Sequence, residues 1–489
     1  MDKLKLILEG FPLLDDAYSS LKDQDVQCRK QADAVTKQLP ETARALISAH
    51  PREALEHLSL SKNTISYAAV LDVVVKPSGI DAGPDRIWLQ EKVAEFLGGF
   101  DPIQIRFVGD TLVRLLTRVA GNGLFTPQRT IQLLATAILR VDPSGSVFTS
   151  THLLLANHAL TLGIIELALP VLDKYITAYP SLTSLRGNRP LSDPELPPAY
   201  YVNTFTGLTE PVKAATVLDY GATLAQIYIS RKEWRKARAA LEQVITHPCK
   251  DKGVVKAMAA AHKRWLLVSL LDIGKAGTLP SYTPSNAKSY YKAQAAYTSL
   301  AEAFVASDPE QLQTEINTHG ITYEEDGNTG LVSQVLQAYQ KWQVINLRMT
   351  YSRISISRIR EETFSGETGQ RLPSTEAADS LLREMINSGI LKARFEVDEH
   401  GNETYLAFQD DTDHVSEEEF MKEIARRQQS VEDLTIEYKL VNQRLTMNKE
   451  YAKFVAREQK RQPDEGTQPA GYDASLEDED LMSGILKAN

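Results

Sequence analysis

Residues 224–248 read LAQIYISRKEWRKARAALEQVITHP, and this stretch decides the fold. Its apolar and small residues recur three or four positions apart, the spacing of one face of an α-helix. The recurring positions are Leu224, Ala225, Tyr228, Ala237, Leu241 and Val244. Alanines let two antiparallel helices approach closely, and Pro248 cannot continue the second helix. The stretch therefore predicts a tight helical hairpin.

The same offsets occur once more, earlier in the chain. The earlier set is Leu155, Ala156, Ala159, Ala168, Leu172, Tyr175 and Pro180, in which only the final proline is shifted, by one residue. Ala168 and Ala237 lie 69 residues apart, close to two tetratricopeptide periods of about 34 residues. Any antiparallel helix pair needs small residues where its helices cross, which is the alternative explanation. The stretch 181–198 is long, rich in proline and not repeat-like.

Short amphipathic helices account for most of the first 350 residues. One is predicted at 102–122, where Asp101 is a start signal and the Gly-Asn-Gly at 121–123 is a stop. Strand-like alternation is scarce in this region. We therefore predict a mainly α protein whose residues 1–325 form a right-handed, tetratricopeptide-like solenoid with repeats of uneven length.

A different pattern begins after Gly330. The predicted elements are a helix at 331–349, a strand and a short helix at 351–364, a helix at 375–387, and strands at 391–397 and 403–408. Ser374 is a suitable N-cap for the last of these helices, and the residues at 398–402 supply a turn between the two strands. Helix, strand, helix, helix and hairpin is the order of a winged helix, which we predict for 326–412.

A long polar helix is predicted at 413–460. Its apolar residues recur in heptads at Ile424, Val431, Leu434, Tyr438, Val441 and Leu445. A solvated helix with one buried stripe is the simpler interpretation. Because roughly 40 helical residues extend about 60 Å, packing against other subunits is favoured. Residues 461–489 are acidic and expected to be disordered, and Ser475 matches an acidic-directed kinase site only weakly.

Composition narrows the class of protein. The chain has 489 residues, a net charge of −10 and two cysteines, Cys28 and Cys249. An acidic balance argues against a surface built for nucleic acid, and two distant cysteines favour a reducing compartment. We read neither a signal peptide nor a membrane-spanning run, so a soluble intracellular protein is expected.

Catalytic and metal-binding motifs are missing from the sequence. It has no paired histidines at metalloprotease spacing, no phosphate loop and no nucleophile elbow. His152 and His158 are interpreted as structural, and Cys249 beside His247 as a structural thiol. We therefore predict no catalytic, cofactor-binding or metal-ligating residue, no cofactor, and no enzyme activity.

The sequence also disfavours DNA binding, although a winged helix raises the expectation of that function. The helix at 375–387 would have to enter the major groove. It carries Glu376, Asp379 and Glu384 against a lone Arg383. Acidic side chains beside phosphates are electrostatically unfavourable.

Helical repeats that run into a winged helix and a terminal helix resemble the PCI-domain proteins of the proteasome lid, the COP signalosome and initiation factors. Several segments are more specific and resemble the subunit-three family of the COP-nine signalosome. They are ITHP at 245–248, KRWLLVSLLDIGK at 263–275, LPSYT at 279–283, DGNTGLV at 326–332 and TMN at 446–448. The first 200 residues share only a helical character with that family.

The resemblance implies a non-catalytic scaffold subunit of the COP-nine signalosome. In that complex a different, metal-dependent subunit removes the ubiquitin-like protein NEDD from cullins and so regulates cullin-RING ubiquitin ligases. The alternative is a PCI subunit of the proteasome lid or of an initiation-factor or mRNA-export complex. A hetero-oligomer in the cytoplasm and nucleus is implied, with no direct DNA or membrane partner.

Two interfaces are implied by the same resemblance. PCI subunits pair through the edges of their winged helices, which here would involve Ala393, Phe395, Val397, Tyr405 and Phe408 by addition of a strand. Their terminal helices gather in a bundle, which here would involve Ile424, Val431, Leu434, Tyr438, Val441 and Leu445.

Overall fold

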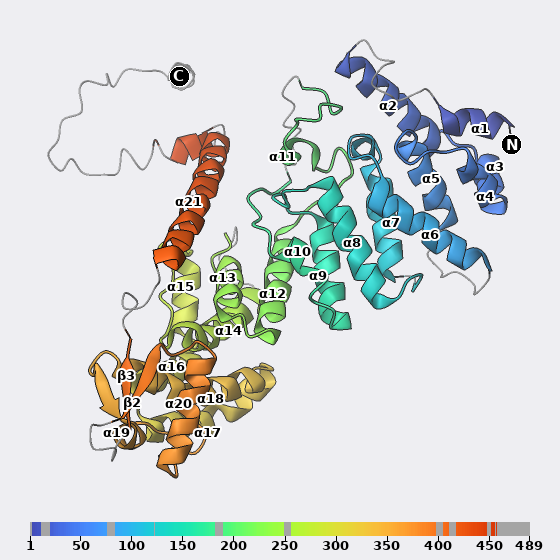
Figure 1. Ribbon diagram of the computed structural model, residues 1–489. Helices are drawn as coiled ribbons and strands as arrows, with labels where there is room; N and C mark the ends of the chain where they lie inside the picture. Colours follow the sequence, from blue (N-terminus) through green and yellow to red (C-terminus); the bar gives the residue numbers. More distant parts are fainter. Residues whose placement is uncertain are drawn as a thin grey trace, which may run out of the picture. The chain divides into compact units, whose positions relative to one another are not determined.

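The computed structural model describes residues 2–10, 20–75, 84–121, 123–180, 189–248, 256–397, 404–409, 417–446, 451–454 and 456. The chain divides into two units, residues 1–413 and residues 414–489. Helices dominate the first unit, and its only described sheet has three short strands between residues 353 and 408 (Figure 1). The predicted fold, a mainly α helical-repeat arm followed by a winged helix and a long helix, is confirmed.

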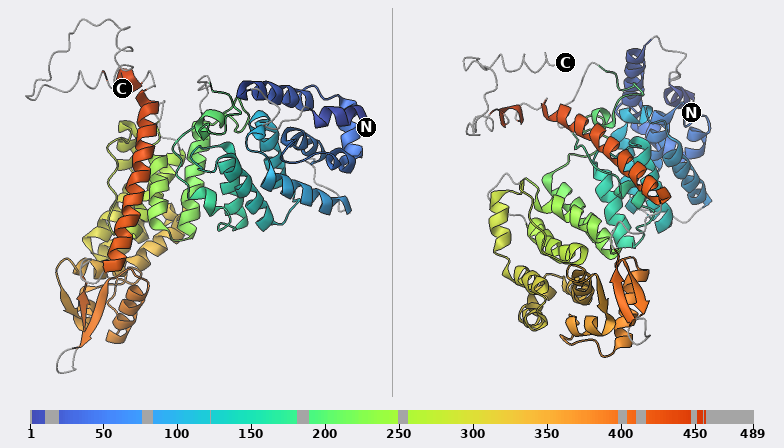
Figure 2. Two further views of the ribbon diagram at one scale, coloured as in Figure 1. Left: turned by 45° about the horizontal axis from the view of Figure 1, so that its top comes forward. Right: turned by 60° about the vertical axis from the view of Figure 1, so that its left-hand side comes forward.

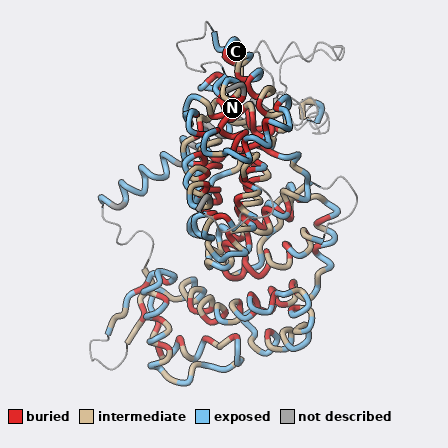
Figure 3. The backbone as a smooth tube through the Cα atoms, turned by 90° about the vertical axis from the view of Figure 1, so that its right-hand side faces the viewer, coloured by how far each residue is buried: buried red, intermediate tan, exposed pale blue. Residues whose placement is uncertain are grey.

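The first part of the arm is a stack of helices around one apolar core. These helices are α1 (Asp2–Glu9), α2 (Leu21–Thr36), α3 (Glu41–Ala49), α4 (Pro51–Glu56), α5 (Thr64–Val74), α6 (Pro84–Gly99), α7 (Gly109–Gly121), α8 (Pro127–Val141) and α9 (Ser150–Leu162). Every residue from Thr64 to Leu71 of α5 is buried, because helices pack around this helix on several sides. Figure 3 shows buried residues along the facing sides of the stacked helices.

The single helix predicted at 102–122 is wrong. The chain forms a 3₁₀ turn, η2 (Gln104–Phe107), and then starts α7 anew at Gly109. The Gly109 amide donates to the carbonyl of Thr206 at 3.2 Å, and a Cβ at this glycine would lie under 3.0 Å from backbone atoms of Thr206 and Leu208. A distant loop therefore breaks the helix, and only glycine permits its close approach.

The two predicted hairpins differ in the structure. Helices α12 (Ala214–Ser230) and α13 (Trp234–Ile245) pack closely, with Ala225 and Ala237 buried between them. The earlier hairpin is wrong in its second helix, since α10 (Leu169–Leu172) is a single turn and Tyr175 is 80% exposed. The chain after α10 instead pairs with residues 146–148, where the Phe148 amide donates to the Ala178 carbonyl at 2.9 Å.

A second core holds the end of the arm. Its helices are α12 to α14 (Lys256–Ile273), α15 (Ser285–Lys292), α16 (Ala295–Ala306), α17 (Pro309–Glu325) and α18 (Thr329–Leu347). Helix α11 (Pro198–Tyr201) is one short turn, and its Tyr201 belongs to the first core. The largest buried side chain is Trp265 of α14, 1% exposed. Gly277 lies against its indole, where a Cβ would not fit.

The winged helix follows directly from α18. It consists of β1 (Arg353–Ser355), α19 (Ile356–Glu362), α20 (Thr375–Asn387), β2 (Ala393–Val397) and β3 (Thr404–Phe408). As predicted, the Ser374 hydroxyl caps α20 by accepting from the Ala377 amide at 3.2 Å. Leu382, Met385 and Leu406 belong to the small core of this module. Figure 2 shows its strands, in orange, beside the orange helices. The predicted turn at 398–402 lies outside the described residues.

The second unit contains α21 (Glu417–Thr446), a helix of 30 residues. It falls within the helix predicted at 413–460; residues 413–416, 447–450, 455 and 457–460 lie outside the described residues, as does the tail at 461–489. Among the helices that the structure describes, none is long and apolar enough to span a membrane.

Candidate interaction surfaces

The strand order of the winged-helix sheet is β1-β3-β2, so β2 lies at one edge. The Gln409 amide donates to the Lys392 carbonyl at 3.0 Å. Hydrogen-bonded pairs alternate along an antiparallel ladder, so the backbone groups of Arg394 and Glu396 also face β3. The N–H and C=O groups of Ala393, Phe395 and Val397 therefore point away from the sheet, where no described strand covers them.

The prediction that Tyr405 and Phe408 belong to the edge is wrong. Both lie on β3, which pairs with β2 on one side and β1 on the other. The Phe408 amide donates to the Ser352 carbonyl at 3.0 Å. Because the backbone of β3 is bonded on both sides, it cannot accept another strand.

Side chains along β2 divide into two faces. Ala393 is buried in the core, and Phe395 lies under the guanidinium of Arg383, 4.6 Å from the ring centre. Of the three residues on this face, only Val397 is largely exposed, at 64%. The opposite face is polar and pairs Glu396 with Arg394 at 2.8 Å. What the edge offers a partner is therefore mainly its backbone.

The apolar stripe of α21 is the other predicted surface. Ile424, Val431, Leu434, Tyr438 and Leu445 are all exposed, by 37% to 69%, and Val441 is partly exposed. Lys422 pairs with Glu418 and Arg427 with Glu423, each at 2.8 Å and one helical turn apart. These pairs stabilise the helix.

Phe420 extends this stripe and was missed from the sequence. It is 56% exposed and lies fourteen residues, or two heptads, before Leu434. Phe420 therefore occupies the same heptad position as Leu434 and Val441. Arg427 interrupts the series, which hid the pattern. Extending the heptad count by one repeat would have found it.

A polar cluster joins the segments that carry the family resemblance. The Lys263 ammonium contacts both oxygens of Asp326 at 2.7 Å, and the Tyr297 hydroxyl donates to the same carboxylate at 2.8 Å. Asn328 donates to the Tyr297 oxygen at 2.9 Å and accepts from Arg264 at 3.2 Å. The cluster ties α14 and α16 to the turn between α17 and α18.

Burial raises the pKa of Tyr297 above its usual range, and the hydrogen bond to Asp326 adds to that effect. The phenol therefore stays protonated and acts as a donor to the Asp326 carboxylate. Lys263 and Asp326 are each about one quarter exposed. A charge-assisted pair of this kind is stronger than a fully solvated one.

ITHP and LPSYT, two further segments that carry the family resemblance, make hydrogen bonds in the same part of the arm. Tyr291 donates to the carbonyl of Ile245 at 3.0 Å, and Tyr282 of LPSYT donates to Glu242 of α13 at 3.1 Å. Segments distant in sequence are thus brought together at the end of the arm. TMN at 446–448 belongs to the second unit, and its last two residues lie outside the described chain.

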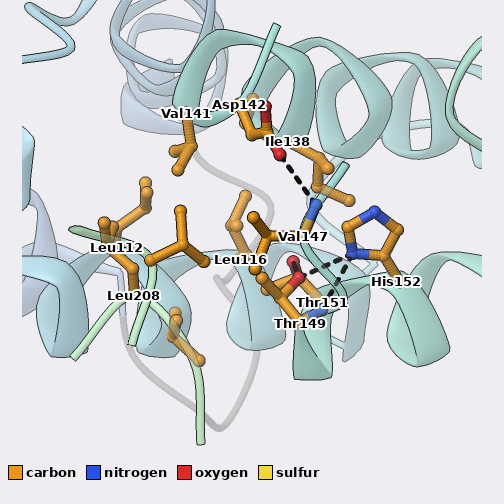
Figure 4. Close-up of a pocket in the computed structure, with 13 residues that line it drawn as sticks. Leu112, Leu116, Ile138, Val141, Asp142, Val147, Thr149, Thr151, His152 and Leu208 are labelled. Atoms are coloured by element: carbon orange, nitrogen blue, oxygen red, sulfur yellow. Dashed lines mark hydrogen bonds between the residues drawn. The ribbon is translucent and has the colours of Figure 1, made fainter. Parts of the chain in front are cut away.

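His152 is a structural residue, as predicted. Its Nδ1 lies 2.7 Å from the Thr149 hydroxyl in a capping box at the start of α9. Burial lowers the pKa of His152 to about 4, so the ring is neutral near pH 7. Figure 4 shows it at the border of a cavity of about 20 Å³ with mostly aliphatic walls, including Leu112, Leu116 and Ile138. His158 is partly buried and its pKa is lowered by burial.

The described residues contain no group of three or more His, Cys, Asp or Glu side chains that could hold a metal ion. Cys249 lies outside the described residues.

On α20, Arg383 pairs with Asp379 at 2.7 Å, and Glu384 with Lys341 at 2.7 Å. The Lys341 hydrogen bond lowers the pKa of Glu384, which keeps this carboxylate charged. Asp379, Arg383 and Glu384 of α20 are therefore all engaged in ion pairs.

The fold defines a class of protein, the helical-repeat chains that end in a PCI-type winged helix. Comparison with known proteins narrows that class. A family model described as COP9 signalosome complex subunit 3, N-terminal helical repeats, matches residues 26–286. A Neurospora crassa protein named COP9 signalosome complex subunit 3 is 34% identical over 444 residues, 88% of this chain and 89% of that protein.

An Emericella nidulans protein of the same name is 31% identical over 331 residues, which cover 65% of this chain and 66% of that protein. The chain belongs to the COP9 signalosome subunit 3 family.

Replacing Asp326 with Asn should destabilise the arm. Lys263 would keep its charge but lose its carboxylate partner, and we expect a loss of about 1–3 kcal/mol. Urea unfolding of the full chain measures it. The matched control is Asp33→Asn, which removes an exposed pair with Lys37 and should cost about 0–1 kcal/mol. Equal shifts for the two variants would show that the Asp326 cluster has no special role.

Proposed function

We propose that this chain is a non-catalytic scaffold subunit of the COP9 signalosome. In this role it supports the removal of NEDD from cullins by a different, metal-dependent subunit, and thereby the regulation of cullin-RING ubiquitin ligases. The observation that carries the proposal is the 34% identity over 88% of the chain to a protein named as subunit 3 of that complex. This match includes most of the chain, whereas the family model covers only residues 26–286.

The absence of enzyme activity is part of the proposal. His152, the buried histidine that the sequence singled out, is neutral and engaged in capping a helix. The most connected polar cluster, around Asp326, joins helices and leaves its charges paired. Both arrangements fix the fold, which is what a scaffold requires of its polar residues.

Four functional parts follow. We propose residues 1–325 as the helical arm, 326–412 as the PCI winged helix, 413–460 as the bundle helix, and 461–489 as an acidic tail. Asp326 stands at the first of these boundaries and contacts α14 of the arm through Lys263. A salt bridge therefore joins the two parts across this boundary, and we expect the winged helix and the end of the arm to move together in the complex.

Two surfaces of different character would bind other PCI subunits. The outer backbone of β2, at Ala393, Phe395 and Val397, would accept a strand by adding hydrogen bonds. The stripe on α21 would enter a helical bundle and bury apolar area, worth about 25 cal/mol per Å². The result is a hetero-oligomer, and we place it in the cytoplasm and nucleus with no direct DNA or membrane contact.

Identification of the proteins that co-purify with the native chain tests the assembly. We expect the other signalosome subunits in constant proportion to this chain, measured by quantitative mass spectrometry after mild affinity purification. Recovery of proteasome lid subunits, or of initiation-factor or mRNA-export subunits, would contradict the proposal.

Charge placed in the α21 stripe should prevent incorporation. Leu434→Asp with Val441→Asp would put two carboxylates where an apolar seam is expected, which is strongly unfavourable when buried. Thr435→Asp with Asn442→Asp adds the same charge one position away and is the matched control. We expect at least tenfold less co-purification for the first pair than for the control. Similar recovery of partners with both pairs would refute the role of the stripe.

Removal of an outward amide should weaken strand addition at β2. Val397→Pro deletes an N–H that faces away from β3, a place where an edge strand tolerates proline. Val397→Ala keeps that N–H but removes two methyl groups, a larger loss of apolar side chain than the proline makes. We expect the proline variant to remain folded but to recover its winged-helix neighbour poorly, and the alanine variant to recover it normally. Equal recovery would argue against pairing through β2.

A further inference from the structure

A hollow lined by three arginines lies in the first part of the arm, far in sequence from both proposed interfaces. It has a volume of about 400 Å³ and is formed by the end of α2 together with α3, α5 and α7. These helices are neighbours in the stack (Figure 1). The charged side chains in its wall are Arg44, Arg114, Arg118 and Asp72. Its net charge is therefore positive, in a chain whose net charge is −10.

Arg118 and Asp72 form the structural part of this site. The Arg118 guanidinium donates to the Asp72 carboxylate at 2.9 Å and to the carbonyl of Val75 at 3.0 Å. Val75 is the C-cap of α5, where carbonyl groups lack helical partners and a positive charge is favourable. Arg118 thus supplies a donor to a carbonyl group at the end of α5, and the Asp72 carboxylate balances the charge of Arg118.

Arg44 and Arg114 make fewer hydrogen bonds than Arg118 does. Arg114 donates from one terminal nitrogen to Asp72 and Thr111, both at 3.1 Å, and Arg44 donates from one terminal nitrogen to the Thr36 carbonyl at 2.9 Å. Among the described residues, these bonds leave other N–H donors of each guanidinium available. Because Asp72 is already shared with Arg118, the charge of the two remaining arginines is not balanced within the lining of the hollow.

The geometry points to a binding site for an acidic peptide segment, held by Arg44 and Arg114 from opposite helices, α3 and α7. Guanidinium groups bind carboxylates and phosphate esters through paired N–H donors, and arginine clusters are a recurring mode of acidic-motif recognition. The bound anion is a carboxylate cluster or a phosphoserine within such a segment. Nucleic acid would need a long basic track, whereas this hollow is local and has the volume of a few side chains.

The test uses the isolated full chain, so its outcome does not depend on the proposed assembly. Fluorescence anisotropy measures binding of a labelled ten-residue peptide of Glu, Asp and Ser at low salt. A second peptide carries one phosphoserine, and a third has Gln and Asn in place of the acids. We expect the first, the second or both to bind, with the stronger one identifying the anion, and the neutral peptide to bind at least tenfold more weakly.

Two double variants locate the site. Arg44→Gln with Arg114→Gln should weaken binding about tenfold or more, since each change removes a charge-assisted contact. Arg129→Gln with Arg235→Gln changes the net charge equally at exposed positions elsewhere on the arm and should leave binding within about twofold. Thermal unfolding confirms that the variants are folded. Arg44→Gln alone, which loses only one exposed hydrogen bond, should weaken binding in the same direction.

Several results would overturn the inference. One is failure of the acidic peptides to bind the unaltered chain, and another is equal binding of the neutral peptide. A third is the same loss in both double variants, which would mean attraction by overall charge. Competition by inorganic phosphate at the same concentration as the peptide would show an adventitious ion only.

Discussion

A salt bridge between Lys263 and Asp326 links α14 to the turn before α18, at the end of the arm. Asp326 stands in the short turn between α17 and α18, and its carboxylate also accepts a hydrogen bond from Tyr297 of α16. A solenoid has mainly nearest-neighbour contacts, whereas this carboxylate joins three parts of the arm at once. Together with the apolar core around α18, the salt bridge holds the helix that runs directly into the winged helix.

Close packing is the second constraint, and it depends on small residues. Ala225 and Ala237 let α12 and α13 meet, while Gly109 lets the loop at 206–208 approach α7. Interiors packed to crystal-like density tolerate few added atoms at such crossings. These crossings therefore leave little room for larger side chains, and such close contact between neighbouring segments suits a subunit whose proposed role is to hold other proteins in place.

The proposed binding surfaces use different physical interactions. The β2 edge offers backbone hydrogen bonds, which are directional and set the register of a partner strand. The α21 stripe offers apolar area, which is non-directional and contributes most of the free energy of association. The arginine hollow on the arm offers charge and acts on partners whose segments are acidic. Together they would let one chain bind several neighbours at once.

Local periodicity determined most of the secondary structure, because helical hydrogen bonds join residues only four apart and a helix shows its buried face in its own sequence. The hairpin at 224–248, the order of the winged helix and the heptads of α21 were all predictable in this way. Sequence could not show that Gly109 divides a helix, that α10 is one turn, or that Tyr405 and Phe408 lie on a central strand. Each depends on a neighbour far away in the chain. Tertiary structure alone brought Arg44 and Arg114 to one hollow, since contacts between distant helices leave no periodic trace in the sequence.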